Sequence, residues 1–356
     1  GDNMKAIKTL SIFMSVTALL SACNSGGTGS SGTTSSTYSV SSKWSTVGVP
    51  IPATQSLSGL LYDKSVDEFF MTQSDDSGKV VGVCHLPRNA SKSQNWNCDI
   101  MLPNEYIIYA NKSLMGNNSG QLYLYAYKKD IGVGSPTILT YDIKNGNSDW
   151  NAQAVTQVNP ITPLDHWLFP SSSAYWNGSL IGISSLPNVL DMINLDNGVL
   201  EEMSNFYAPI ADNRQTIIGD NLYYSNIKYS KAGDAQEYIY TKNLISQESA
   251  TQVGMQLPEW AINSLSGSSQ QVYVCTGGNI YANSLLASTN SQWRVLPPTS
   301  QLSVKYSNAD STILDSTGCY VVIEANNTLY ALASVYESAT SGANSGKTKR
   351  LLKLSL

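Results

Sequence analysis

Short apolar runs separated by tight turns recur along most of this chain. Clear examples are Glu68-Phe69-Phe70-Met71, Tyr106-Ile107-Ile108-Tyr109, Leu122-Tyr123-Leu124-Tyr125 and Glu237-Tyr238-Ile239-Tyr240. Runs that are rich in aromatic and branched residues and bounded by Asn-Gly, Gly-Asn or Ser-rich turns are typical of strands paired in hairpins. After Trp44 no stretch of helical length keeps apolar residues at spacings of three and four. The sequence therefore predicts an all-β fold.

Two kinds of segment alternate within this pattern, six of each. The first kind is a turn followed by strand-forming residues, and its members are Ser77-Gly78-Lys79-Val80-Val81, Ser119-Gly120-Gln121-Leu122-Tyr123, Asn177-Gly178-Ser179-Leu180-Ile181, Gly219-Asp220-Asn221-Leu222-Tyr223, Gly277-Gly278-Asn279-Ile280-Tyr281 and Asn326-Asn327-Thr328-Leu329-Tyr330. The second kind often ends at a proline. Its members at residues 44–50, 96–103, 150–160 and 293–297 begin at a tryptophan, and two weaker members, at 201–209 and 251–258, fill the gaps. The members recur about every 50 residues, which is the length of a four-stranded repeat unit.

This pattern resembles a six-bladed β-propeller of the Kelch or galactose-oxidase-like kind. In that family a tryptophan opens the outer strand of a blade, and a hairpin bounded by glycine precedes an aromatic strand. The resemblance extends from about Trp44 to Leu356, and the Gly-Gly doublet typical of Kelch repeats occurs once, at Gly277-Gly278. It implies a single β-propeller over residues 44–356, with six four-stranded blades.

The two ends of this region fit the closure of such a ring. Trp44-Ser45-Thr46-Val47 has the pattern of an outer strand with no blade before it, and Leu351-Leu352-Lys353-Leu354 that of a strand with nothing after it. Pairing of these N- and C-terminal strands in one composite blade would cover both exposed edges. The alternative fold is a pair of β-sandwiches.

The N-terminal segment has the layout of an export signal. Lys5 and Lys8 precede an apolar run that ends at Leu20 and is followed by small residues. This run is shorter than the about 20 apolar residues that span a membrane. Its last residues, Leu20-Ser21-Ala22-Cys23, resemble the lipobox of bacterial lipoproteins. The resemblance implies that residues 1–22, including three extra residues before Met4, form a signal peptide and that Cys23 is lipidated.

A lipidated Cys23 would hold the mature protein on a membrane, because several acyl chains such as palmitate together give stable anchoring. Asn24 stands where retention in the inner membrane usually requires Asp, which favours an outer-membrane lipoprotein on the periplasmic or surface face of the cell envelope. Residues 23–43 are mostly Ser, Gly and Thr. Because they offer little apolar surface to offset the entropy of ordering, we predict a disordered tether with a reach of about 25 Å.

Four cysteines remain besides Cys23, and they are Cys84, Cys98, Cys275 and Cys319. An even number in an oxidising compartment predicts disulfides, and four cysteines allow three pairings. We favour Cys84 with Cys98, which occupy successive predicted strands, and this leaves Cys275 with Cys319. Buried free thiols are the alternative. No cysteine pair has the spacing of a zinc knuckle, so we predict no metal site.

The chain carries few signals for catalysis. Its two histidines, His85 and His166, are predicted to be surface or capping residues, and no serine lies in a nucleophile elbow. The segment Ser74-Asp75-Asp76-Ser77-Gly78 partly matches the Asp-box of sialidases, which is a folding turn. Phosphate loops, EF-hand loops and metalloprotease helices are missing from the sequence. We therefore expect no cofactor and favour binding over enzymatic activity, although an active site assembled from scattered loops would escape these motifs.

Aromatic residues near predicted loops, with one carboxylate and one histidine, are the candidate binding residues. They are Asp165, His166, Trp167, Tyr175, Trp176 and Trp260. Aromatic side chains suit stacking on a sugar or gripping a peptide, and packing between blades is the alternative. The net charge of -5 and pI of about 5.1 argue against nucleic acid as a partner.

These observations predict a membrane-anchored envelope lipoprotein whose propeller is a binding or scaffolding module for another envelope protein. The charged fraction of 13% is about half of the usual fraction and is typical of extracytoplasmic β proteins. The alternative function is a carbohydrate-binding or carbohydrate-active propeller, sialidase-like or otherwise glycan-processing.

Overall fold

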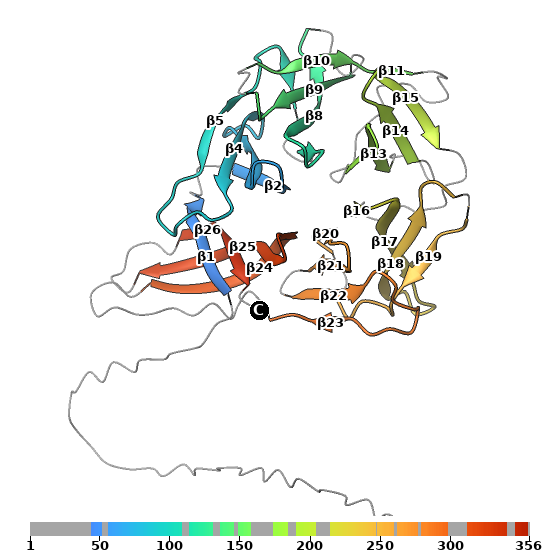
Figure 1. The fold of residues 1–356 in the computed structure, drawn as a ribbon. Helices are drawn as coiled ribbons and strands as arrows, with labels where there is room; N and C mark the ends of the chain where they lie inside the picture. Colours follow the sequence, from blue (N-terminus) through green and yellow to red (C-terminus); the bar gives the residue numbers. More distant parts are fainter. Residues whose placement is uncertain are drawn as a thin grey trace, which may run out of the picture. The chain divides into compact units, whose positions relative to one another are not determined.

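In the computed structural model of this protein, the residues described are 44–51, 56–108, 114–130, 136–145, 149–157, 174–183, 190–203, 214–246, 248–259, 262–276, 279–297, 312–339 and 346–354. Their strands form six sheets, which stand as blades around a central axis (Figure 1). The predicted signal peptide, Cys23 and the predicted tether lie outside the described residues.

The first three blades follow one another along the chain. Blade I consists of β2 (Ser56–Asp63), β3 (Glu68–Ser74), β4 (Val80–Pro87) and β5 (Asn97–Met101). In blade II the inner position is shared by β6 (Tyr106–Ile107) and β7 (Met115–Gly116), followed outward by β8 (Gln121–Lys128), β9 (Pro136–Asp142) and β10 (Asn151–Ala154). Blade III consists of β12 (Ala174–Trp176), β13 (Ser179–Ile183), β14 (Leu190–Asn194) and β15 (Val199–Met203), and β11 (Thr156–Gln157) pairs in parallel with β15 at its outer edge.

The last three blades complete the ring. Blade IV consists of β16 (Gln215–Ile218), β17 (Asn221–Tyr229), β18 (Ala235–Asn243) and β19 (Thr251–Val253). Blade V consists of β20 (Ser264–Gly267), β21 (Gln271–Cys275), β22 (Ile280–Ser284) and β23 (Arg294–Val295). Blade VI consists of β24 (Thr312–Ala325), β25 (Thr328–Ala339), β26 (Gly346–Leu354) and, as its outer strand, β1 (Trp44–Ile51).

The innermost strands contact one another in a closed circle. Around the axis β2 packs beside β7, β7 beside β12, β12 beside β16, β16 beside β20, β20 beside β24, and β24 beside β2. This order confirms the predicted six-bladed propeller, and the alternative of two β-sandwiches is wrong.

Blade VI closes the ring by joining the two ends of the folded region. The outer strand β1 pairs antiparallel with β26, with Trp44 opposite Leu354 and Val47 opposite Leu351. The predicted pairing of the terminal strands is therefore confirmed. It covers the edge of β26, which would otherwise be open to another strand.

The apolar cores lie between neighbouring blades, so that each blade buries both of its faces. The cluster around Phe70 and Leu124 joins blades I and II, and the cluster around Tyr223 and Val274 joins blades IV and V. Corresponding clusters occupy the other four junctions. Because both faces are covered, the middle strands are apolar in continuous runs instead of alternating, as in Leu122-Tyr123-Leu124-Tyr125, whose four residues are all buried.

Four outer strands begin at a tryptophan, as predicted. Trp44 is the first residue of β1, and a tryptophan stands directly before β5, β10 and β23. Three of the four indole N–H groups donate to a backbone carbonyl of the preceding blade: Trp44 to Pro297 at 2.9 Å, Trp150 to Met101 at 3.0 Å and Trp293 to Met255 at 2.8 Å. The buried N–H of Trp96 has no acceptor among the described residues. Trp44, Trp150 and Trp293 therefore link neighbouring blades by hydrogen bonds as well as by packing.

The six glycine or asparagine turns of the sequence repeat do not all occupy the same position in their blades. Four of them lead from the first strand to the second, whereas those at 77–81 and 277–281 lead from the second to the third. Blades I and V build their first hairpins from other turns, in which Asp63 Oδ1 accepts from the backbone N–H of Ser65 at 2.8 Å and Ser268 Oγ from that of Gln270 at 3.2 Å. The predicted number of repeats is right, but their assumed equivalence is wrong in these two blades.

Candidate functional site

A cavity of about 660 Å³ lies on the axis of the ring. Its walls come from the innermost strands of all six blades and from the turns that follow several of them. The volume is within the range of small-molecule sites, about 300–1,000 Å³. The cavity is therefore the first candidate for a binding site.

Close packing of the inner strands depends on two glycines. A Cβ atom on Gly116 would collide with Leu61 of the neighbouring blade I, and one on Gly267 would collide with Ile218 of the neighbouring blade IV. Branched side chains thus fill the space that these glycines leave. The inner strands approach closely there and narrow the space around the axis.

The cavity wall mixes apolar and polar residues. Blades I and II contribute Leu60, Leu61, Leu114 and Met115 together with Lys64 and Asn118. Blades IV, V and VI contribute the apolar residues Ile217, Leu265, Val321 and Ile323, and amide and hydroxyl groups from Gln215, Asn263, Ser264, Ser266, Asn326 and Asn327. Such a wall suits a ligand that combines apolar surface with several hydrogen-bonding groups.

Gln215 is the most deeply buried polar residue of this wall, with 6% of its surface exposed. Its Nε2 donates to the carbonyl of Ile181 in blade III at 3.3 Å. No donor from the described part of the chain reaches its Oε1. A buried acceptor without a partner costs free energy, so a donor on a ligand or a water molecule would stabilise it.

The charged groups of the cavity come from three different blades. Glu324 is the one carboxylate among the described lining residues, and it accepts a hydrogen bond from the Tyr273 hydroxyl at 2.5 Å. Burial, and then the contact with Glu324, raises the pKa of Tyr273 above its ordinary value. Arg214 donates through Nε to the carbonyl of Ile262 at 3.1 Å, and Lys64 is exposed. Glycoside hydrolysis uses two facing carboxylates. The described lining residues of this cavity supply one carboxylate, that of Glu324.

The carboxylate of Asp67 fastens blade VI to blade I beside this cavity. Its Oδ1 accepts from the Tyr62 hydroxyl at 2.6 Å, from Arg88 Nε at 2.6 Å and from Asn326 Nδ2 at 3.2 Å. The Arg88 hydrogen bonds hold the pKa of Asp67 below its ordinary value. Burial, together with the hydrogen bond to Asp67, raises the pKa of Tyr62 to about 12. Because Tyr62 and Asn326 also line the cavity, this network positions part of its wall.

Two of the predicted binding residues lie in the described structure, and only one of them reaches the cavity. Tyr175 lines the cavity and stacks on Tyr123, with ring centroids 5.9 Å apart. Trp176 packs into the core between blades III and IV, and its indole N–H donates to Asp220 Oδ1 at 3.1 Å. Trp176 therefore has the packing role that was the alternative prediction. The remaining candidates, Asp165, His166, Trp167 and Trp260, lie outside the described residues.

His85 lies away from the cavity, on the surface of blade I. Its Nδ1 is 2.7 Å from Glu68 Oε2 and its Nε2 is 3.2 Å from Asp99 Oδ1, so it bridges three adjacent strands. Its contacts give it a structural part in this sheet. In the segment that resembles an Asp-box, Asp75 Oδ1 accepts from the backbone N–H groups of Ser77 and Lys79. This carboxylate shapes the turn before β4, as expected of a folding turn.

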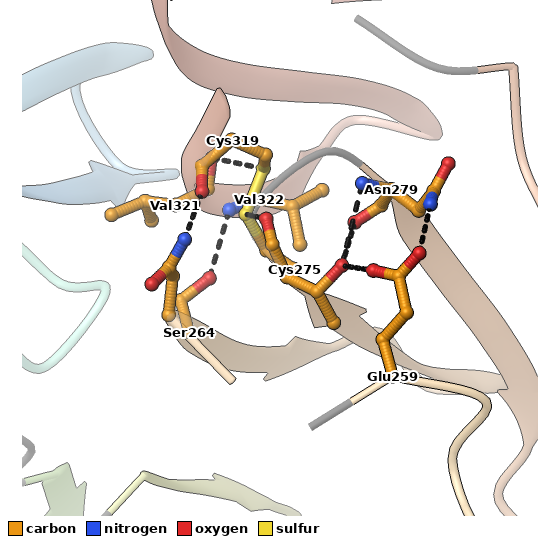
Figure 2. The surroundings of a disulfide bond; sticks show 9 residues. Glu259, Ser264, Cys275, Asn279, Cys319, Val321 and Val322 are labelled. Atoms are coloured by element: carbon orange, nitrogen blue, oxygen red, sulfur yellow. Dashed lines mark hydrogen bonds between the residues drawn. A yellow bond between two sulfur atoms is a disulfide. The ribbon is translucent and has the colours of Figure 1, made fainter. Parts of the chain in front are cut away.

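Both predicted disulfides are present in the structure. Cys84 and Cys98 join β4 to β5 within blade I, with their Cα atoms 4.0 Å apart. Cys275 and Cys319 join β21 of blade V to β24 of blade VI. Figure 2 shows this second disulfide, with Glu259 nearby accepting hydrogen bonds from Thr276 and Asn279. One disulfide thus cross-links two strands within blade I, and the other cross-links the closing blade VI to blade V.

In the part of the chain that the structure describes, no group of three or more His, Cys, Asp or Glu residues could hold a metal ion. No helix within the same ranges has the length and apolar character needed to cross a membrane.

Comparisons with known proteins find likeness in solved structures. A chain in a nidogen/laminin complex is 13% identical, with 78% of this chain and 97% of that chain covered at a TM-score of 0.46. A gluconolactonase from Xanthomonas campestris, XC5397, is 9% identical, with 88% of each chain covered at a TM-score of 0.48. The β-propeller domain of the Trilobed protease from Pyrococcus furiosus is 6% identical, with 82% and 83% covered at a TM-score of 0.40. No protein-family model and no curated protein sequence matches this chain. At these values the likenesses carry no statement about activity.

Sequence reasoning missed most residues of the cavity wall. Gln215 and Glu324 lie within strands, and nothing in their sequence context distinguishes them from surface residues. Only the order of blades around the axis brings them near one another, and that order depends on ring closure. Tyr175 was found because an aromatic residue at the start of a predicted strand is itself a signal.

Proposed function

We propose that this protein is a lipid-anchored envelope protein whose propeller binds another envelope protein. The observation that carries the binding role is the axial cavity, whose wall presents amide and hydroxyl groups from three consecutive blades, among them the buried Gln215. A rigid ring that displays such groups is suited to hold a partner by hydrogen bonds and by complementary shape. The anchor rests on the lipobox resemblance at Leu20-Ser21-Ala22-Cys23.

The binding role is tested by affinity purification of the full-length protein from detergent-solubilised envelopes. The comparison uses a variant altered at the cavity, Gln215→Leu with Asn326→Asp, and a control altered on the outer surface at the exposed Lys128, Lys128→Gln. We expect one stoichiometric partner with the wild type and the control, and its loss in the cavity variant. Equal recovery of the partner with all three proteins would contradict binding through the cavity.

The anchor is tested by mass spectrometry of the mature N-terminus. We expect the chain to begin at residue 23 and to carry a diacylglyceryl group and an N-acyl chain. Substitution Cys23→Ala should block this modification and the cleavage that follows it. An unmodified Cys23 in protein isolated from its own cell envelope would exclude the anchor while leaving the binding role open.

A second candidate function is the binding of a carbohydrate or a similar polar small molecule in the same cavity. It is favoured by the cavity volume of about 660 Å³ and by the two tyrosines of its wall, Tyr62 and Tyr175, which could stack on a sugar ring. Calorimetric titration with envelope glycan fragments would measure it, with Gln215→Leu as the binding-deficient variant. Product analysis in the same samples would reveal any glycan processing.

A further inference from the structure

The same hydrogen bond ties the third hairpin to the first hairpin in five of the six blades. The residue after the third strand donates its backbone N–H to a carbonyl of the first hairpin of that blade: Arg88 to Asp67, Ile143 to Gly120, Leu195 to Gly178, Leu244 to Asp220 and Leu285 to Gln270, at distances from 2.8 to 3.1 Å. First and third hairpins therefore lie on one side of the ring, which we call the hairpin side.

In four of these blades the third hairpin starts with the same capped turn. The last residue of the third strand accepts, through its side chain, the backbone N–H two positions later: Asp142 from Lys144, Asn194 from Asp196, Asn243 from Ile245 and Ser284 from Leu286. The residue between donor and acceptor packs against a blade core, as Leu244 and Leu285 do. The donor residue points outward.

The outward residue of this turn is charged in two blades and apolar in two others. Lys144 in blade II and Asp196 in blade III are exposed. Ile245 in blade IV is 68% exposed, and Leu286 in blade V is 94% exposed. Because the same turn forms with lysine or aspartate, the fold does not require an apolar residue there. The two exposed apolar side chains on neighbouring blades are therefore not explained by the fold itself.

The other exposed apolar side chains of these two blades lie on the opposite side of the ring. Met255 follows the outer strand of blade IV, and Val295 pairs with Tyr281 at the start of the third strand of blade V. On the hairpin side of these two blades the exposed large apolar residues are therefore Ile245 and Leu286. We call these two residues the apolar rim.

The start of β1 indicates what covers the apolar rim. β1 begins at Trp44, which pairs with Leu354 at the end of β26, the third strand of blade VI. The third strands end on the hairpin side, so β1 begins on that side, and its Trp44 indole donates to the carbonyl of Pro297 after the outer strand of blade V. With the proposed lipid on Cys23, a tether of about 20 residues would keep this side within about 25 Å of the membrane.

We infer that the apolar rim rests on the membrane, with Ile245 and Leu286 inserted among the lipids. This inference depends on the proposed anchor at Cys23. Once the lipid on Cys23 has inserted, the contact of Ile245 and Leu286 with the bilayer is intramolecular. The effective concentration of lipid at these two side chains is then high, so their insertion is enough to orient the ring. The opposite side of the ring, with the connections between blades, then faces away from the bilayer and is open to a partner.

The test uses the full-length lipidated protein in vesicles of phosphatidylethanolamine and phosphatidylglycerol that carry a photoactivatable acyl chain. After illumination, lipid adducts are mapped by mass spectrometry on the peptides that contain Ile245 and Leu286 and on the matched peptides that contain Lys144 and Asp196. We expect at least ten times more adduct on the first pair. The double variant Ile245→Asp with Leu286→Asp should lose this adduct, with its disulfides and its lipid on Cys23 unchanged.

Equal labelling of the four turns, or labelling that the double variant retains, would overturn the inference. A dimer that the double variant abolishes, seen by light scattering in detergent and without lipid adducts, would overturn it by assigning the apolar rim to a second copy of the chain. The mass of the N-terminal peptide in the same sample separates these results from failure of the anchor, because a chain without lipid on Cys23 would contradict the proposed anchor itself.

Discussion

The tryptophans that open the outer strands offer a matched test of how the blades are held together. Trp150 and Trp293 are 8% and 7% exposed, and each donates its indole N–H to a carbonyl of the preceding blade. Trp96 occupies the same position in blade I, but its buried N–H has no acceptor among the described residues. The substitution Trp→Phe removes the N–H and part of the ring at all three positions. Only at Trp150 and Trp293 does it also break a link between blades.

The expected magnitudes follow from these contacts. Loss of ring volume costs about 1 kcal/mol at each site, from the known dependence on cavity size. Loss of the hydrogen bond adds about 1 kcal/mol, and the abandoned carbonyl about 1 kcal/mol more where water does not reach it. We therefore expect Trp150→Phe and Trp293→Phe to lower the free energy of unfolding by about 2–3 kcal/mol. For Trp96→Phe we expect about 1 kcal/mol or less, because removing an unsatisfied donor offsets part of the lost packing.

The assay is urea unfolding followed by tryptophan fluorescence and circular dichroism under non-reducing conditions. The midpoints of the three variants are compared at equal slope, so that the difference reports stability and not a change in the unfolded state. A Trp96→Phe protein as unstable as the other two variants would refute the argument that the indole hydrogen bonds join the blades.

The remaining predictions concern the disulfides and the carboxylate of Asp67. Replacing Cys275 and Cys319 by serine should cost about 4 kcal/mol of stability in the chain-entropy model, and replacing Cys84 and Cys98 about 3 kcal/mol. The first pair costs more because its sequence separation is 44 residues, against 14 for the second pair. Thermal unfolding measures both losses, and the opposite order would contradict the model. The folded-state pKa of Asp67 lies below its unfolded value, so its contribution is present above about pH 4 and is lost as the pH falls through the folded-state value. The stability gap between the wild type and Asp67→Asn should therefore be widest near neutral pH and narrow in acid, and because the side chain is 42% exposed the gap should also shrink with salt.

The sequence predicts the repeat well because strand and turn chemistry is local. Tight turns and aromatic strands recur with a period close to the length of a blade, and tryptophans mark four outer strands. Ring closure was also predictable, because Trp44 and Leu354 lie at the two ends of the repeat array and each leaves an edge that needs a partner.

The axial cavity was not predictable, because its wall depends on contacts between residues that are far apart in the sequence. Its wall joins residues as distant in sequence as Leu61, Gln215 and Glu324, and no local pattern records which side chains face the axis. The phase of the repeat was misread in blades I and V because their first hairpins are built on Asp63 and Ser268 instead of glycine. Several different turns satisfy the same backbone geometry, so the turn residue does not identify the hairpin.

The central claim is that β1 closes the ring by pairing with β26, and amide hydrogen exchange of the full-length protein tests it most directly. Peptides from 44–51 and 346–354 should exchange slowly and together, because each strand protects the other through the pairs from Trp44–Leu354 to Val47–Leu351. The variant Thr46→Pro should speed exchange in both segments, while peptides from blades III and IV keep their protection. Exchange of residues 44–51 at the rate of an unfolded chain, with 346–354 still protected in the wild type, would contradict the closed propeller.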